Sequence, residues 1–232
     1  MTAAGDTFPR VRPVADHAVL VEFGDVIERN VQDRVRQLDA ALSSHPIAGF
    51  TEAVPAYTSL LVGFDPLVTD HAIVKSEIDR LLMHSGAVFQ AGSVRDVLVC
   101  YDDAFAPDLG EVADMTGLSR EEVIAAHLSG DYSVSMYGFA PGYAYLAGVP
   151  EPIQLPRKPA AVRDVPAGSV IIAGPQCLVT TLDMPTGWWI IGRSPTAVLR
   201  QDDDRPFLFD VGDCIRFKQI DRQTFETEKR RG

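Results

Sequence analysis

Apolar residues along the first ninety positions alternate between strand-like and helix-like spacing, which predicts a compact α+β domain. The expected elements are a strand at 17–23, a helix carrying Val31, Val35, Leu38 and Leu42 on one stripe, strands at 50–56 and 59–64, a helix from Thr69 or Asp70 to Gly86, and a strand at 94–101. This β-α-β-β-α-β order is typical of a ferredoxin-like domain. The pattern leaves open whether the strand at 94–101 belongs to this domain or begins the next one.

From residue 132 onward, almost every apolar segment has the length and composition of a short strand. These segments lie at 132–139, 169–173, 177–181, 188–191, 206–209 and 214–220. Short strands separated by Gly- and Pro-rich turns favour a closed or nearly closed barrel over a parallel sheet. Two short helices are expected before them, and Ser119 with Glu122 forms a capping box for the second. The polar C-terminal sequence FETEKRRG is expected to fray.

The sequence HSGAVFQAGSVRD, between these two halves, is small and polar enough to be a linker. We therefore predict a boundary near residue 90. The first domain is the α+β domain at 1–90, and the second is the β-barrel domain at 91–232.

The charge of the chain argues against nucleic acid as a partner. It has 21 basic and 32 acidic residues and a net charge of −11, whereas binding to phosphate backbones requires clustered Lys and Arg. Cys100, Cys177 and Cys214 lie far apart without zinc-site spacing, so no metal site is expected, and their odd number indicates a reducing, cytoplasmic environment. An apolar signal core and a run of about 18 apolar residues are both absent, so no membrane association is expected.

One loop combines glycine with aromatic residues in a way that suits a ligand pocket. It reads Tyr137-Gly138-Phe139-Ala140-Pro141-Gly142-Tyr143. Its glycines permit positive φ and close approach of a ligand to the backbone, and its aromatic side chains could form a wall. The alternative is a bulged strand end with aromatic core packing, which the residues alone favour because glycine inside a strand usually marks a bulge.

Several arginines lie beside this region and are candidates for binding an anion. Arg157, Lys158 and Arg163 flank a proline-rich connection, and arginine holds carboxylate or phosphate in a bidentate manner. A solvated basic loop is the equally weighted alternative. Arg193 ends an apolar strand, where its guanidinium must reach solvent or find an anion.

Two single residues also have chemistry to consider. His127 lies on the apolar face of its helix, and a histidine held by a backbone carbonyl is favoured over a general base. Cys177 has the form of a nucleophile, but residues 128–232 contain no histidine to activate it, so a small buried thiol is the better interpretation.

Seven motifs in order carry a resemblance to a known family: SLLVGFDP, EEVIAAH, SVSMYGFAPGYAYLAG, LPR, VPAGSVIIAGPQ, GWWIIGRSP and VGDCIRF. They resemble the family of the 5-oxoprolinase B subunit, also called allophanate hydrolase subunit 1 or the sporulation-kinase inhibitor family. The chain departs from the family at Ala161–Val162, where a Pro-Arg pair is common, and at 177–181 and 185–188.

The resemblance implies that the second domain is a cyclophilin-like β-barrel. It also implies work in a complex with a homologous, larger C subunit and with a third component, the A subunit, in which ATP hydrolysis drives opening of the 5-oxoproline lactam to L-glutamate. ATP, with Mg²⁺, would be bound only in the complex if at all. The substrate class expected for this chain is a small anionic amide or lactam.

On this basis we expect a pocket near the glycine-rich loop. The substrate-binding candidates are Tyr137, Gly138, Phe139, Pro141, Gly142, Tyr143 and Gln176, and the catalytic candidates are Arg157, Arg163, Arg193 and His127. The resemblance also allows two other functions, inhibition of a sensor histidine kinase and a carboxyltransferase-like role in urea or allophanate metabolism.

Overall fold

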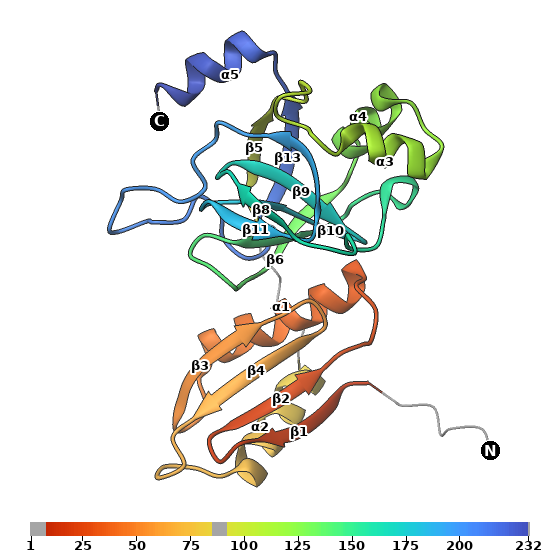
Figure 1. Cartoon of the computed structure of the whole chain (residues 1–232). Coiled ribbons are helices and arrows are strands. Elements are labelled where there is room, and N and C mark those ends of the chain that lie inside the picture. Colours follow the sequence, from red (N-terminus) through yellow and green to blue (C-terminus); the bar gives the residue numbers. More distant parts are fainter. Residues whose placement is uncertain (1–7, 85–91, 232) are drawn as a thin grey trace, which may run out of the picture. The chain divides into compact units, whose positions relative to one another are not determined.

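The computed structural model describes residues 8–84 and 92–231, and the chain divides into two compact units, residues 1–90 and 91–232 (Figure 1). The predicted helix end at Gly86, the predicted boundary near residue 90 and most of the predicted linker lie outside the described residues. Each unit has its own hydrophobic core.

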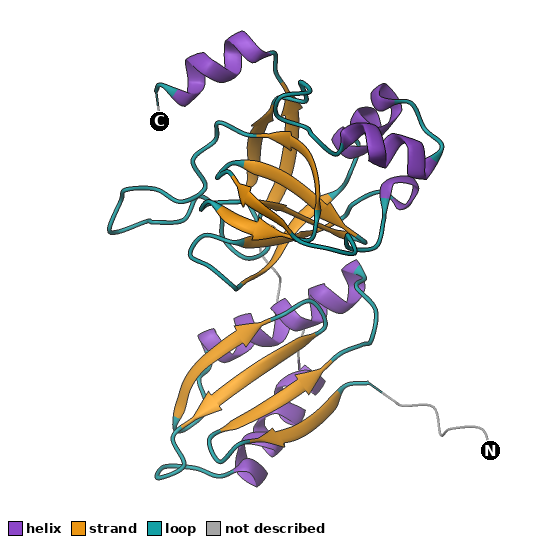
Figure 2. Ribbon diagram, in the orientation of Figure 1, coloured by secondary structure: helices purple, strands orange, loops and turns teal. Residues whose placement is uncertain are grey.

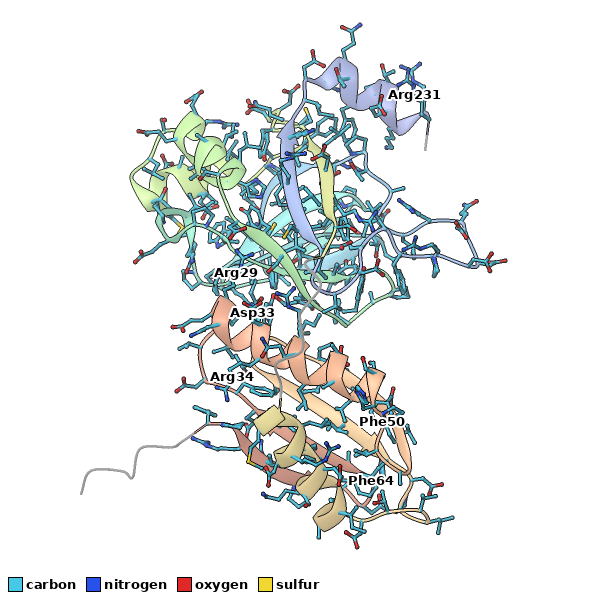
Figure 3. The ribbon with its side chains drawn as sticks, turned by 180° about the vertical axis from the view of Figure 1, so that it is seen from behind. Arg29, Asp33, Arg34, Phe50, Phe64 and Arg231 are labelled. Carbon is cyan, nitrogen blue, oxygen red and sulfur yellow. The ribbon has the colours of Figure 1, made fainter. Side chains whose placement is uncertain are left out.

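The first unit is a four-stranded antiparallel sheet with two helices. Its elements are β1 (Arg10–Val14), β2 (Ala18–Glu22), α1 (Arg29–Ser44), β3 (Phe50–Pro55), β4 (Ser59–Phe64) and α2 (His71–His84), and the strand order is β1-β2-β4-β3. Phe50 and Phe64 lie directly opposite each other across β3 and β4 (Figure 3). Both helices pack on the sheet and on each other (Figure 1).

The core of this unit follows the predicted periodicity. The stripe formed by Val31, Val35, Leu38 and Leu42 on α1 is buried, as expected. It packs in one cluster with residues that alternate along the strands, such as Val19 and Val21 of β2. Strands with one buried face and helices with one apolar stripe therefore account for this unit.

The structure answers the question that the pattern left open about the strand at 94–101. That strand, β5 (Val94–Val99), belongs to the second unit, where it pairs with a strand near the C-terminus. The edge of the first sheet is taken instead by β1, which sequence analysis did not predict. The first unit therefore has an α+β fold, while the ferredoxin-like and cyclophilin-like assignments stay predictions.

The second unit is built around a seven-stranded sheet. Its elements are β5, α3 (Leu109–Thr116), α4 (Arg120–Leu128), β6 (Tyr132–Tyr137), β7 (Ala144–Ala147), the 3₁₀ turn η1 (Glu151–Ile153), β8 (Val162–Val165), β9 (Ser169–Ala173), β10 (Gln176–Val179), β11 (Met184–Thr186), β12 (Trp189–Arg193), β13 (Cys214–Gln219) and α5 (Arg222–Lys229). The sheet order is β12-β9-β10-β7-β6-β13-β5, and β8 and β11 form a separate two-stranded arm. Helices lie outside the strands (Figure 2).

The two edges of this sheet meet, so that it forms a nearly closed barrel. The amide of Cys100 donates to the carbonyl of Arg193 at 2.8 Å, and the amide of Arg193 donates back at 2.9 Å. These two bonds join the end of β5 to the end of β12. The expectation of a closed or nearly closed barrel is thereby confirmed, and the apolar residues inside it form the largest core cluster.

Two sequence expectations for this unit are wrong. Residues 206–209 form no strand and make only an isolated bridge between Leu199 and Phe207. The C-terminal segment expected to fray, residues 225–232, instead forms most of helix α5 up to Lys229; Asp221 caps this helix, and Phe225 is buried to 1% exposure. The capping box of Ser119 and Glu122 on α4 is confirmed.

We predict that Gly192→Ala destabilises the second unit, because the strands at the barrel closure pack too closely for a side chain. A methyl group at Gly192 would lie 2.7 Å from Cγ1 of Val99 and 3.2 Å from the carbonyl oxygen of Cys100. The expected cost is about 1–3 kcal/mol in the free energy of unfolding. Urea unfolding followed by tryptophan fluorescence measures it, since Trp188 and Trp189 both lie in this unit.

Gly110→Ala in α3 is the matched control. Its new methyl group would meet only the flexible end of Arg120, at 3.4 Å, and alanine favours a helix. Equal unfolding midpoints for the two variants would show that the closure tolerates a side chain.

Candidate functional site

The described residues form a depression of about 220 Å³ on the outer surface of the barrel, here called the aromatic depression. Its lining residues are Phe139, Tyr143, Tyr145, Arg157, Ile171, Leu178, Pro185, Thr186, Gly187 and Trp188. These residues come from separate parts of the second unit. The depression therefore exists only after the barrel has folded.

The floor of the aromatic depression comes from strands that are apolar on both faces. On β9, Ile172 packs in the barrel interior, while Ile171 packs in a second cluster on the outside. On β10, Cys177 and Leu178 divide in the same way. The outward residues need a cover, which the loop at 138–143 and the arm β8–β11 supply in part.

The wall combines aromatic rings with one cation. The guanidinium of Arg157 lies 5.6 Å from the Trp188 ring centroid, and the Tyr145 ring meets the same indole edge-on at 5.9 Å. Arg157 makes no ion pair within the part of the chain that the structure describes. Burial raises the pKa of Tyr143 and of Tyr145 above the ordinary phenol value, although Arg157 lowers it in part for Tyr145.

A buried ion pair holds the segment from which Arg157 projects. Lys158 Nζ lies 2.5 Å from Asp108 Oδ2, and both side chains are largely buried. The same carboxylate oxygen accepts from the amide of Ile190 at 2.6 Å, and the amide of Lys158 donates to the carbonyl of Gly187 at 2.7 Å. Trp189 Nε1 also donates to the Pro156 carbonyl at 2.8 Å. These bonds tie residues 156–158 to β12 and the start of α3.

Two residues of the glycine-rich loop, Phe139 and Tyr143, form one rim of the aromatic depression. Gly142 has φ of 74°, and Phe139 also has a positive φ, 71°, while its side chain is 75% exposed. The Phe139 ring lies 5.7 Å from that of Tyr143. The hydroxyl of Thr181 donates to the Pro141 carbonyl at 2.6 Å and holds the loop in place.

Not all of the predicted substrate-binding residues reach this site. Tyr137 donates its hydroxyl to the Phe209 carbonyl at 2.7 Å and stacks on Phe207, so it braces a neighbouring loop. Gly138, Pro141, Gly142 and Gln176 are not among the residues that line the depression, and Gln176 pairs within the sheet. Phe139 and Tyr143 do line it.

The three candidate arginines are separated from one another. Arg157 lines the aromatic depression, whereas Arg163 is exposed and lines a hollow beside Asp164 and Asp183. Arg193 lines a third cavity, beneath α5. The structure therefore associates only Arg157 with the glycine-rich loop.

His127, a predicted catalytic residue, is fully buried in the barrel core and does not line the aromatic depression. Its Nδ1 lies 2.7 Å from the Tyr101 hydroxyl, so the expected backbone carbonyl is not its partner. Its Nε2 lies 3.7 Å from Cys177 Sγ, so the histidine nearest to this thiol comes from before residue 128, fifty positions away along the chain. Burial lowers the pKa of His127 to about 3 and raises that of Cys177 far above its usual value. The expectation of a small buried thiol is confirmed.

Sequence reasoning did not place Trp188 or Asp108 in the site, although each had a signal. Trp188 belongs to the doubled tryptophan of GWWIIGRSP, in which adjacent strand residues must face opposite sides of the sheet. Asp108 follows a proline and precedes a helix, a position at which aspartate is common as the N-cap residue. Its link to Lys158 spans fifty positions, so no local pattern contains it.

Residues 9–209 match the family described as the carboxyltransferase domain, subdomain C and D. The chain belongs to this family. A relative in Bacillus subtilis (strain 168), named as the B subunit of 5-oxoprolinase, is 34% identical over 231 residues, covering 95% of this chain and 96% of the relative. The resemblance that the seven motifs indicated is thereby confirmed.

Solved structures show the same fold. A crystal structure of TTHA0988 is similar with a TM-score of 0.75 at 35% identity, over 88% of this chain and 40% of that chain. This chain thus spans less than half of the TTHA0988 chain. The Kluyveromyces lactis urea amidolyase matches with a TM-score of 0.76 at 17% identity over 98% of this chain and 16% of that one, which shows a shared fold alone.

We expect Lys158→Ala to destabilise the second unit by about 3 kcal/mol, because it leaves the buried carboxylate of Asp108 without its counter-ion. Urea unfolding followed by tryptophan fluorescence measures the change, and Trp189 lies 5.3 Å from the Lys158 ammonium. Lys218→Ala is the control, since Lys218 pairs with Asp96 at an exposed position. A shift no larger than that of the control would contradict the anchoring role.

Acid is expected to destabilise the barrel through His127, the only histidine between residues 92 and 231. Because its pKa falls from 6.5 to about 3 on folding, the unfolded chain binds a proton that the folded chain does not. Stability is therefore complete above pH 6.5 and is lost as the pH falls toward 3. The free energy of unfolding of the parent chain, relative to that of His127→Gln, should fall by about 3 kcal/mol between pH 7 and pH 4. Urea unfolding at the two pH values measures this change.

The variant His45→Gln, at an exposed position in the first unit, serves as the control for this titration. It should change the tryptophan-monitored stability equally at both pH values. A constant difference between the parent chain and His127→Gln would mean that the buried imidazole does not titrate on unfolding.

No helix in the described ranges 8–84 and 92–231 combines the length and apolar character needed to cross a membrane.

Proposed function

We propose that the chain is the B subunit of an ATP-dependent 5-oxoprolinase and that the aromatic depression binds the carboxylate-bearing lactam. The observation that carries this proposal is an arginine without an ion-pair partner in the described chain, set against Trp188 in a small concave site. The Bacillus subtilis relative, which carries the 5-oxoprolinase name and aligns over nearly the whole of both chains, supports the reaction class.

The lining of the depression suits a small ring that carries one negative charge. Arg157 would hold the substrate carboxylate through paired hydrogen bonds, which are strong when the acceptor is ionised. Trp188 and Tyr145 present aromatic surface to the ring. A phenol is protonated at neutral pH, so the Tyr143 hydroxyl can donate to a lactam carbonyl.

The depression needs a second chain to complete the chemistry. None of its described lining residues is an aspartate, glutamate or histidine, which are the usual general bases for activating water. The TTHA0988 chain, which is more than twice as long, contains additional sequence beyond the part that resembles this chain. We propose that a larger partner protein, the homologous C subunit, supplies the base, and that this chain binds and orients the substrate.

ATP and Mg²⁺ are assigned to the complex as part of the proposal. The described residues contain no group of three His, Cys, Asp or Glu side chains placed to hold a metal ion, and the chain has no P-loop. A nucleotide therefore does not fit the residues of the depression, and the role proposed for this chain involves no step through it.

A concave, cation-lined site favours a small anionic ligand over a flat protein surface, which separates this proposal from the kinase-inhibitor alternative. The test is co-expression with the larger partner protein, followed by an assay for ATP-dependent formation of glutamate from 5-oxoproline. Wild-type complex that releases no glutamate would contradict the proposed reaction.

Arg157→Ala in the assembled complex should raise KM for 5-oxoproline about tenfold or more, since the substrate loses a charge-assisted pair. Arg157→Lys should recover part of this loss. Arg200→Ala removes an equal charge from an exposed loop outside the depression and should leave KM unchanged. An active complex whose KM does not respond to Arg157→Ala would contradict the assignment of the depression and leave the reaction standing.

A further inference from the structure

The cavity that Arg193 lines is where the C-terminal helix covers the barrel. It measures about 180 Å³ and is here called the α5 cavity. Arg193, Ser194 and Thr196 line it from the end of β12 and the following loop, and Phe225 and Lys229 line it from α5. Phe225 is 1% exposed and packs on Phe105 with ring centroids 4.4 Å apart, which anchors the helix over the cavity.

Arg193 is held in place without being neutralised. Its Nε donates to the carbonyl of Ala167 at 3.3 Å, and its guanidinium lies 5.9 Å from the Phe105 ring centroid. No carboxylate in the described residues forms an ion pair with it. The terminal amino groups of its guanidinium are therefore available to an anion.

Two hydroxyl groups of the α5 cavity are also available as donors. The Ser194 oxygen accepts from the amide of Thr196 at 3.1 Å, and the Thr196 oxygen accepts from the amide of Leu98 at 3.2 Å. Neither hydroxyl donates to another residue in the described ranges, so each proton can be donated to a ligand. The cavity thus offers hydroxyl donors beside a guanidinium.

The charges around this cavity differ from those of the chain as a whole. The chain carries 32 acidic against 21 basic residues, yet none of the described residues that line the cavity is acidic. Two acidic residues are bonded to the cavity wall: the carboxylate of Asp183 accepts from the amide of Ala167 at 2.6 Å, and the backbone carbonyl of Asp221 accepts from the amide of Phe225 at 3.0 Å. Lys229 adds a second positive charge to the lining, and the Arg222 guanidinium lies 5.6 Å from the same Phe105 ring. The electrostatics therefore favour an anion.

We propose that the α5 cavity binds a phosphoryl group through Arg193 and Lys229, with Ser194 and Thr196 as hydroxyl donors. Donors from β12, the following loop and α5 suit the several oxygens of a tetrahedral anion better than the two oxygens of a carboxylate. The group could belong to free phosphate or to a nucleotide. The site lies apart from the aromatic depression, so this inference does not depend on the proposed reaction.

The test is isothermal titration of the full chain with inorganic phosphate and, separately, with ATP, at fixed ionic strength. We expect saturable binding of one or both, and the two titrations distinguish free phosphate from a nucleotide. Arg193→Ala should weaken binding at least about tenfold, because a charge-assisted contact is lost. Lys229→Ala, at an exposed position of α5, should also weaken it and leaves the barrel intact.

Arg200→Ala is the matched control, since it removes the same charge from the next residue after the cavity lining. It should leave the affinity unchanged, and circular dichroism checks that all variants are folded. The proposal would be overturned if neither phosphate nor ATP bound to the chain. Equal weakening by Arg193→Ala and Arg200→Ala would also overturn it, because the binding would then reflect diffuse surface charge.

Discussion

The buried carboxylate of Asp108 is the interaction on which the candidate site depends. It accepts hydrogen bonds from the ammonium of Lys158 and from the amide of Ile190. One side chain therefore joins the start of α3, strand β12 and the segment that carries Arg157. A charge removed from water in this way is stable only while its partners stay in place. The position of Arg157 beside Trp188 is therefore coupled to the folding of the whole barrel.

The barrel supports two different surfaces because its strands are apolar on both faces. Inward residues of β9 and β10 fill the interior, around the contact between His127 and Cys177, whereas outward residues form a separate cluster under the arm β8–β11. The incomplete cover of that outer cluster leaves the aromatic depression. Where the sheet closes between Cys100 and Arg193, the Arg193 side chain lies in a separate cavity beneath α5.

Local sequence patterns were sufficient to predict an element where its buried residues recur at the spacing of a helix or a strand. The stripe on α1, the capping box of α4 and strand β9 could all be predicted, because each depends on residues a few positions apart. Strand β1 was missed because its burial pattern is mostly exposed, and Pro13 suits only an edge strand. Helix α5 was missed because a single aromatic residue, Phe225, holds it to the barrel.

The sequence by itself determined the family and the division into an α+β half and a β-rich half. Only the tertiary structure decided which candidates share that site. It placed Arg157, Arg163 and Arg193 in three different hollows and buried His127 in the core. The physical reason is that side-chain convergence depends on contacts between distant segments, such as Lys158 with Asp108, and the spacing of residues along the chain does not encode those distances.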